Sequence, residues 1–214
     1  MTRALVIAGG PAPDEEVTDS LPDADLVIAA DGGADHARRL GIRPDVVIGD
    51  LDSVSGAALS WLGERGVEVV EHPVDKDATD LDLAMTHAAS LADEIVVIDS
   101  GAGRIDHSTA NTLLLASDRF AHVAVTALTQ AGVISVVRGR RELRGEVDDV
   151  VSLLAVGGAA TGVGTTGLRW PLTNAILEPG STLGVSNEFV ESTATVTVSG
   201  GVLLAVQPVR RPLD

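Results

Sequence analysis

Clustered carboxylates between Asp31 and Asp82 are the feature of this sequence that points most directly to chemistry. They are densest in Gly49–Ser53, with the sequence GDLDS, and in Asp75–Asp82, with the sequence DKDATDLD. Carboxylates that crowd together repel one another and are costly to desolvate unless a cation lies among them. Mg²⁺ prefers such oxygen ligands and bridges carboxylates to substrate phosphates. These residues therefore predict a magnesium–phosphate site.

Sequence-distant polar loops follow the apolar runs that would have to position such a site. Asp31-Gly32-Gly33 follows the run Leu26–Ala29, Asp50 and Asp52 follow Val46–Ile48, and the loop Gly101–His107 follows Ile95–Ile98. In an open parallel sheet, ligands bind beyond the carboxyl ends of the strands. The loops are therefore expected to meet along one edge of a sheet.

The first half of the chain alternates short β-branched runs with helical patterns, which is typical of a parallel sheet covered by helices on both faces. The expected strands are Leu5–Ala8, Leu26–Ala29, Val46–Ile48, Val67–Val70 and Ile95–Ile98. The expected helices are Ala34–Leu40, Ala57–Arg65, Leu81–Leu91 and Ser108–Ala116. The helix at Leu81 has the clearest pattern, an apolar stripe made by Leu81, Ala84, Met85 and Ala88. Thr79 stands three residues before Asp82 and is its expected N-cap.

From about Val133 onward, short β-type runs separated by glycine replace the helical periodicity. The expected strands are Val133–Val137, Val150–Val156, Ala194–Val198 and Val202–Val206. Strands of this length and spacing favour a small antiparallel sandwich or barrel. The sequence thus predicts an α/β chain with a parallel-sheet domain over residues 1–132 and an all-β domain over residues 133–214.

Composition limits the partners of this chain of 214 residues, whose 45% hydrophobic content suffices for a core. The formal net charge of −16 argues against nucleic acid or an anionic membrane surface as a partner. It suits either a cationic substrate or a solubilising acidic surface. The absence of cysteine excludes disulfides and thiolate chemistry. The apolar run Ala4–Ala8 is too short for a signal peptide, and no run approaches the ~20 residues of a membrane span, so we expect a cytoplasmic protein.

Several of these residues also have a purely structural interpretation. Gly32 and Gly33 either allow a tight turn or let backbone N–H groups approach a phosphate. Arg104 and Asp106 form either a surface ion pair or a phosphate clamp steered by the carboxylate. Trp170 either packs in a core or offers its ring to a planar or cationic ligand, with Phe189 as a second wall.

Six motifs, in order, resemble the thiamine pyrophosphokinase family, and together they cover most of the chain. They are Asp31-Gly32-Gly33, Pro44–Ser53, Asp75–Asp80, Arg104–His107, Thr165–Leu172 and Ser186–Phe189. One departure is Ala102 before Gly103-Arg104, where the family usually has Gly-Gly-Arg. Its methyl group could crowd a close approach of the backbone to a phosphate. Lys76 inside the acidic segment could contact a phosphate or relieve repulsion.

The resemblance implies a Rossmann-like ATP- and Mg²⁺-binding catalytic domain, a thiamine-binding β-sandwich, and a homodimer with active sites between subunits. The implied reaction transfers pyrophosphate from ATP to the thiamine hydroxyl and releases AMP. The implied ligands of Mg²⁺ are Asp50, Asp52 and Asp80, which with Asp77 make the catalytic set. The implied nucleotide-binding residues are Asp31, Gly32, Gly33, Asp75, Thr79, Arg104 and Asp106. The implied thiamine-binding residues are Trp170, Ser186 and Asn187, and the general base is hypothesised to be Asp80 or Asp77.

Two other classes of function stay open. The segment Asp50–Val54 also fits the Asp-x-Asp-x-Val signature of haloacid-dehalogenase-like phosphatases, although it does not follow the first strand. A non-enzymatic thiamine or nucleotide sensor would bind ligand without turnover. Such a sensor would not require so many ligands of the kind that Mg²⁺ prefers.

Overall fold

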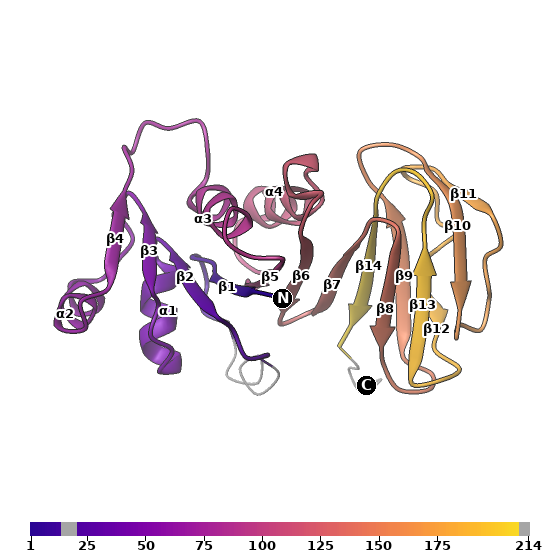
Figure 1. Cartoon of the computed structure of the whole chain (residues 1–214), viewed down its shortest axis with the longest axis horizontal. Helices are drawn as coiled ribbons and strands as arrows, with labels where there is room; N and C mark the ends of the chain where they lie inside the picture. The colour runs from indigo at the N-terminus through magenta and orange to yellow at the C-terminus, as the bar shows by residue number, and fades with distance from the viewer. Residues whose placement is uncertain (14–20, 210–214) are drawn as a thin grey trace. The chain divides into compact units, whose positions relative to one another are not determined.

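The structure, a computed structural model, describes residues 1–13 and 21–209. The chain divides into two compact units, Met1–Gln130 and Ala131–Asp214, against a predicted division between residues 132 and 133. Figure 1 labels the helices and strands of both units. The structure is mixed α/β, with a large sheet and a separate antiparallel sheet, which agrees in outline with the predicted class. Among the described residues, none of the helices has the length and apolar character needed to cross a membrane.

Among the described residues of the first unit, six strands pair in parallel, in the order β6-β5-β1-β2-β3-β4. Their bounds are β1 (Arg3–Ile7), β2 (Leu26–Ala30), β3 (Val46–Gly49), β4 (Glu68–Glu71), β5 (Glu94–Ile98) and β6 (Ala124–Thr129). The sheet grows from β1 to β4 and the chain then returns to the other side of β1 for β5 and β6. The strand order therefore reverses beside β1, and such a reversal creates a crevice at the carboxyl ends of the strands.

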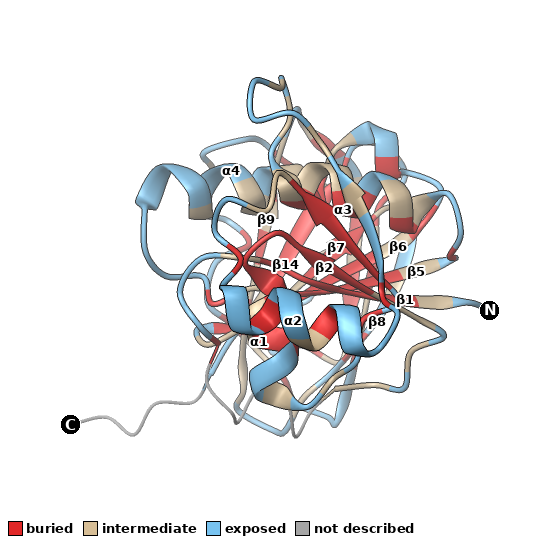
Figure 2. Ribbon diagram, turned by 90° about the vertical axis from the view of Figure 1, so that its left-hand side faces the viewer, coloured by how far each residue is buried: buried red, intermediate tan, exposed pale blue. Residues whose placement is uncertain are grey.

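Helices cover both faces of this sheet, with α1 and α2 on one side and α3 and α4 on the other (Figures 1 and 2). Their bounds are α1 (Gly33–Leu40), α2 (Gly56–Glu64), α3 (Asp80–Ala89) and α4 (Ile105–Leu115). Ala34 of α1 and Leu62 of α2 are buried in one cluster with Val47 of β3. Burial on both faces explains the continuous apolar runs of the strands.

Helix α3 forms as its sequence predicts. Thr79 is the N-cap, and its hydroxyl accepts a hydrogen bond of 3.2 Å from the Asp82 backbone N–H. The stripe that was expected to face the core is buried throughout. Both the N-cap and the buried face are therefore confirmed, and the cap places Asp80 in the first turn of the helix.

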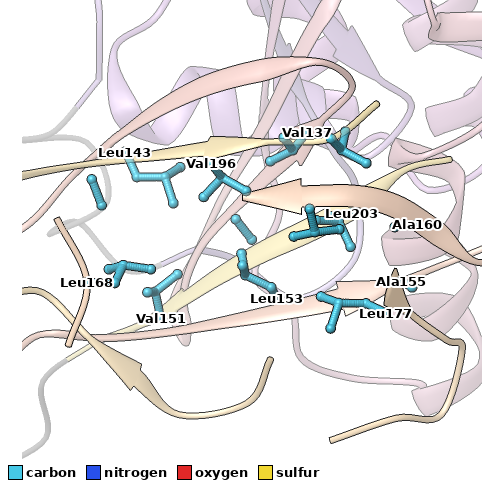
Figure 3. Packing of buried hydrophobic residues seen from close by; sticks show 14 of the residues in the cluster. Val137, Leu143, Val151, Leu153, Ala155, Ala160, Leu168, Leu177, Val196 and Leu203 are labelled. Carbon is cyan, nitrogen blue, oxygen red and sulfur yellow. The ribbon is translucent and has the colours of Figure 1, made fainter. Parts of the chain in front are cut away.

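The second unit contains two antiparallel sheets, in the orders β12-β9-β14-β7 and β11-β10-β13-β8. The strands are β7 (Gly132–Val137), β8 (Arg140–Arg144), β9 (Val150–Ala155), β10 (Ala160–Thr166), β11 (Ala175–Leu177), β12 (Asn187–Glu188), β13 (Thr193–Thr197) and β14 (Leu203–Pro208). One hydrophobic cluster contains residues from both sheets, among them Leu153 of β9, Val196 of β13 and Leu203 of β14 (Figure 3). Phe189 is fully buried in this cluster, so the structure contradicts its expected role as a wall of a ligand site.

Some strands have no clear sequence signal. In β8, with the sequence RRELR, Leu143 is the one buried side chain, and the other four residues are exposed or half-buried. Strand β10, with the sequence ATGVGTT, contains two glycines, which weaken the β pattern. Pairing with β13, rather than intrinsic preference, accounts for both strands.

Gly33 is required where α1 begins against the sheet. A Cβ atom at this position would lie 2.1 Å from the Ile7 carbonyl oxygen of β1. We expect Gly33→Ala to destabilise the first unit by about 1–3 kcal/mol, because helix and strand must separate. Gly63→Ala is the matched control: its Cβ meets open space inside α2, and removing a helical glycine stabilises by up to about 1 kcal/mol. Denaturant unfolding measures both, and effects of the same sign would contradict the packing argument.

Candidate functional site

A cavity of about 620 Å³ lies at the carboxyl edge of the sheet in the first unit. Its walls come from the loops that follow β1, β2, β3, β4 and β5. This volume is in the range of small-molecule sites, about 300–1,000 Å³. The cavity therefore lies where the strand order reverses and where the sequence places its polar loops.

Three carboxylates from two loops converge beside this cavity. One carboxylate oxygen from each of Asp31, Asp50 and Asp52 lies within 4.8 Å of the other two. Asp31 lines the cavity and is only 7% exposed. Its Oδ1 is buried and has no hydrogen-bond partner among the described residues. A buried carboxylate oxygen without a partner is costly unless a cation lies beside it, and this set of oxygen donors fits a hard divalent cation such as Mg²⁺.

The backbone at the ends of β2 and β3 brings these carboxylates together. The Asp31 backbone N–H donates a hydrogen bond of 2.9 Å to the Ile48 carbonyl. A Cβ atom on Gly49 would lie 2.8 Å from the Asp31 Cβ, so only glycine permits this approach. Asp31 and Leu51 take positive φ angles of 44° and 64°, a conformation that costs free energy in residues other than glycine.

Lys76 is the cation nearest to this acidic group. Its Nζ donates a hydrogen bond of 2.6 Å to Asp50 Oδ2 and lies 3.1 Å from Asp80 Oδ1. The second contact is an ion pair to a buried oxygen, and Asp80 Oδ1 has no further polar partner among the described residues. The hydrogen bond from Lys76 lowers the pKa of Asp50, and Asp50 raises the pKa of Lys76. Burial raises the pKa of Asp80 and outweighs the opposing effect of Lys76.

Asp99 organises the loop that follows β5. Its carboxylate accepts hydrogen bonds from the Gly101 backbone N–H at 3.1 Å and from Asn111 Nδ2 at 2.9 Å. Sequence reasoning missed Asp99, although its place directly after a buried strand was an available signal. Gly101 and Gly103 have φ angles of 67° and 91°, whereas Ala102 between them is not in this region. The methyl group of Ala102 therefore imposes no backbone strain on the loop.

Arg104 lines the cavity while it pairs with Asp106. The guanidinium donates from Nε to Asp106 Oδ1 at 3.1 Å and from Nη2 to Oδ2 at 2.5 Å. This two-point hydrogen bond lowers the pKa of Asp106 to about 2. Both side chains are largely exposed. Arg104 thus forms a surface ion pair with Asp106 and also lines the cavity.

The structure distributes the other predicted residues unevenly. Thr79 and Asp80 line the cavity, and Asp50 and Asp52 adjoin it through their neighbours Lys76 and Asp31. Neither Asp50 nor Asp52 is itself among the residues that line the cavity, and the other predicted residues outside its lining are Gly32, Gly33, Asp75, Asp77 and Asp106. Asp75 and Asp77 are exposed, and Gly33 packs against β1 instead.

The predicted thiamine-binding residues lie in the second unit. Trp170 is 54% exposed, whereas Asn187 is buried. Asn187 Oδ1 accepts hydrogen bonds from the backbone N–H groups of Trp170 at 3.0 Å and Glu188 at 2.9 Å, and its Nδ2 donates to the Trp170 carbonyl at 2.7 Å. Ser186 is exposed with a φ of 58°. Asn187 thus holds the backbone that presents the Trp170 ring.

Two family models match consecutive parts of the chain. The model of the thiamin pyrophosphokinase catalytic domain matches residues 17–127, and the model of the thiamin pyrophosphokinase vitamin B1 binding domain matches residues 140–203. The first match contains the carboxylates and the cavity-lining loops from β2 onward, and the second contains Trp170 and Asn187.

Relatives of known name agree with these matches. The thiamine pyrophosphokinase of Bacillus subtilis (strain 168) is 26% identical over 213 residues, which cover 97% of this chain and 99% of that protein. Thiamine pyrophosphokinase 1 of Oryza sativa subsp. japonica is 25% identical over 86% of this chain and 79% of its own length. The crystal structure of the Bacillus subtilis protein superposes with a TM-score of 0.84 at 26% identity, covering 99% of this chain and 100% of that one. A thiamin pyrophosphokinase from Candida albicans, at 16% identity, shares the fold with a TM-score of 0.79 over 97% of this chain and 89% of its own.

Removing Arg104 is expected to release the pKa of Asp106. In Arg104→Gln, that pKa should rise from about 2 toward its ordinary value of 3.8. The lowered pKa means that the ion pair stabilises the folded chain above pH 3.8 and that this contribution disappears as the pH falls toward 2. Carboxyl ¹³C NMR titration measures the shift. Arg119→Gln is the control, since Arg119 pairs with Asp82 instead; an unchanged Asp106 pKa in Arg104→Gln would contradict the assignment.

Asn187→Ala is expected to loosen the backbone around Trp170. The substitution leaves the N–H groups of Trp170 and Glu188 without their acceptor, at a cost of about 1–3 kcal/mol. Amide hydrogen exchange at these two residues should accelerate, and denaturant unfolding should shift to lower concentration. Ser186→Ala, next to it on the exposed surface, is the control and should change neither. Unchanged exchange in Asn187→Ala would show that these hydrogen bonds do not hold the segment.

Proposed function

This chain belongs to the thiamin pyrophosphokinase family, and on that premise we propose that it is a thiamine diphosphokinase. The enzyme transfers the pyrophosphoryl group of ATP to the hydroxyl group of thiamine, which yields thiamine diphosphate and AMP. The observation that carries this function is the match of both the catalytic and the vitamin B1 binding models, in order, along one chain. Nothing in these matches favours a phosphatase or a sensor.

The first unit is proposed to be a Rossmann-like nucleotide domain, and the second a thiamine-binding β-sandwich. The reversal of strand order beside β1 and the cavity at that edge support the first assignment. The hydrophobic cluster that draws on both antiparallel sheets supports the second. On these assignments, the boundary between the nucleotide-binding and the thiamine-binding domain lies close to residues 130–133.

The acidic group is proposed to bind ATP through Mg²⁺. Asp50, Asp52 and Asp80 are the proposed ligands, and the unpartnered Oδ1 of Asp31 supports adding that residue to the set. When bound, Mg²⁺ supplies positive charge against the negative charge that develops on the phosphates. Arg104 and the loop around Gly103, which also line the cavity, are proposed to orient the phosphate chain. Gly32, Gly33, Asp75, Thr79 and Asp106 complete the proposed nucleotide-binding residues.

The transfer is proposed to be an in-line displacement. The thiamine hydroxyl oxygen forms a bond to the β-phosphorus, the bond from that phosphorus to the oxygen it shares with the α-phosphorus breaks, and AMP leaves with the electron pair. The hydroxyl proton passes to a carboxylate. Of the two hypothesised bases, Asp80 is the better placed, because it lines the cavity, whereas Asp77 is exposed and does not line it. Only a carboxylate oxygen of Asp80 that does not bind Mg²⁺ could accept the proton.

The thiamine rings are proposed to rest on Trp170. Its exposed indole offers a flat face to a cationic aromatic ring, a contact worth about 0.5–2 kcal/mol. Ser186 is proposed to contact the substrate directly, and the hydrogen bonds of Asn187 support a positioning role for that residue. From the membership of this family, we further propose a cytoplasmic homodimer whose active sites lie between subunits.

A coupled assay for AMP tests the proposed reaction. AMP and thiamine diphosphate should form together, and only when ATP, Mg²⁺ and thiamine are all present. Asp52→Asn should lower turnover by about 10²-fold or more, since it removes one charge from the acidic group. Asp82→Asn is the matched control, because Asp82 pairs with Arg119 and does not belong to the group of Asp31, Asp50 and Asp52. Phosphate released from simple esters without ATP would instead indicate a phosphatase, and thiamine binding without turnover a sensor.

A further inference from the structure

Lys76 is the single lysine of this chain, and the other basic side chains among its 15 Lys and Arg residues are all arginine. Among the described residues, it pairs with Asp50 of the acidic group and with Asp80, and its side chain is only 13% exposed. Lysine carries a compact charge on a flexible stem, whereas arginine holds a carboxylate with a rigid two-point fork. The Lys76 ammonium can therefore move from one carboxylate to another when its side chain rotates.

Asp50 has two possible cationic partners, Lys76 and a metal ion. It pairs with Lys76 at 2.6 Å, and it also belongs to the group with Asp31 and Asp52 that could hold a metal ion. A divalent cation in that group would lie close to the Lys76 ammonium, and the two positive charges would repel each other. The buried, unpartnered Oδ1 of Asp31 indicates that Lys76 alone does not satisfy the group.

Lys76 has a second carboxylate within reach. Its Nζ lies 3.1 Å from Asp80 Oδ1, four residues further along the chain in the first turn of α3. The ammonium can therefore release Asp50 without leaving its acidic surroundings. Lys76 also lines the cavity, so a bound anion would lie within reach of its flexible stem.

We propose that the Lys76 ammonium partly neutralises the acidic group in the nucleotide-free protein. When the metal–nucleotide complex binds, the divalent metal replaces Lys76 as the cation at Asp50. In this exchange the ammonium moves from Asp50 to the nucleotide phosphates, so that one residue first relieves repulsion and then contacts the substrate. The proposal rests on the proposed function of the site. It implies that metal and nucleotide bind cooperatively, because the nucleotide draws away the charge that opposes the metal.

Titration with Mn²⁺ in the absence of ATP and thiamine tests the exchange, with free Mn²⁺ measured by electron paramagnetic resonance. Lys76→Met should bind Mn²⁺ about tenfold or more tightly than the wild type, because the competing charge is gone. Lys76→Arg, which keeps the charge, should show no gain. Arg119→Met is the matched control: it removes one positive charge beside Asp82, which lies in α3 with Asp80 but is not among the cavity-lining residues. Equal or weaker binding by Lys76→Met, or an equal gain in Arg119→Met, would overturn the proposal.

A second measurement uses the wild-type protein and needs no variant to fold. Because the chain has one lysine, ¹³Cε-lysine labelling gives a single lysine side-chain NMR signal that belongs to Lys76. The signal should shift when Mg²⁺ and a non-hydrolysable ATP analogue are added together, and much less with Mg²⁺ alone. An unchanged signal at saturation with both would overturn the exchange.

The two hypotheses fail separately in these experiments. A wild type that forms AMP while Lys76→Met shows no gain in Mn²⁺ affinity would reject the role of Lys76 and leave the reaction standing. A gain in Lys76→Met in a protein that forms no AMP would keep the competition at Asp50 and reject the proposed reaction.

Discussion

Carboxylates at the edge of the parallel sheet must be held close together although their charges repel one another, and much of the first unit can be understood from this constraint. Gly49 allows Asp31 to approach the end of β3, and Lys76 supplies a positive charge at Asp50. Desolvation adds to the cost, since burial raises the pKa of Asp80. A site kept in this condition favours any ligand that brings further positive charge.

The topology of the sheet makes such crowding feasible. Parallel strands all end at one edge, so a polar residue after each buried strand reaches the same region of space. Asp31, Asp50 and Asp99 occupy that position after β2, β3 and β5. Helix packing fixes the edge further, because Gly33 seats α1 against β1 and Thr79 starts α3 beside the cavity. Small changes in backbone geometry would therefore alter the distances between these carboxylates.

The main feature of the predicted site in the second unit is an exposed aromatic ring rather than a cluster of charges. Trp170 is exposed, and an exposed ring keeps a fixed orientation only if its backbone is anchored. Asn187 supplies the anchor by bonding both the N–H and the carbonyl of Trp170, and Arg169 adds ion pairs to Asp148 and Glu188. Leu168 and Phe189, which stand two positions from Trp170 and Asn187 in the sequence, are buried in the core of the second unit and so anchor this segment further.

Features that depend on local spacing could be predicted from the sequence. The strands with continuous apolar runs, the helix stripe of α3 and its Thr79 cap all follow from residues a few positions apart, and the carboxylates were visible because they follow those strands directly. The sequence predicted that the loops of Asp31, Asp50 and Asp52 meet at one edge, but contacts between distant segments were needed to show that one oxygen of each lies within 4.8 Å of the others. The same holds for the pairing of Asp82 with Arg119 and for the charged segment that forms β8. These outcomes depend on strand order, register and close backbone approach between distant segments, and local sequence preferences do not specify such pairings.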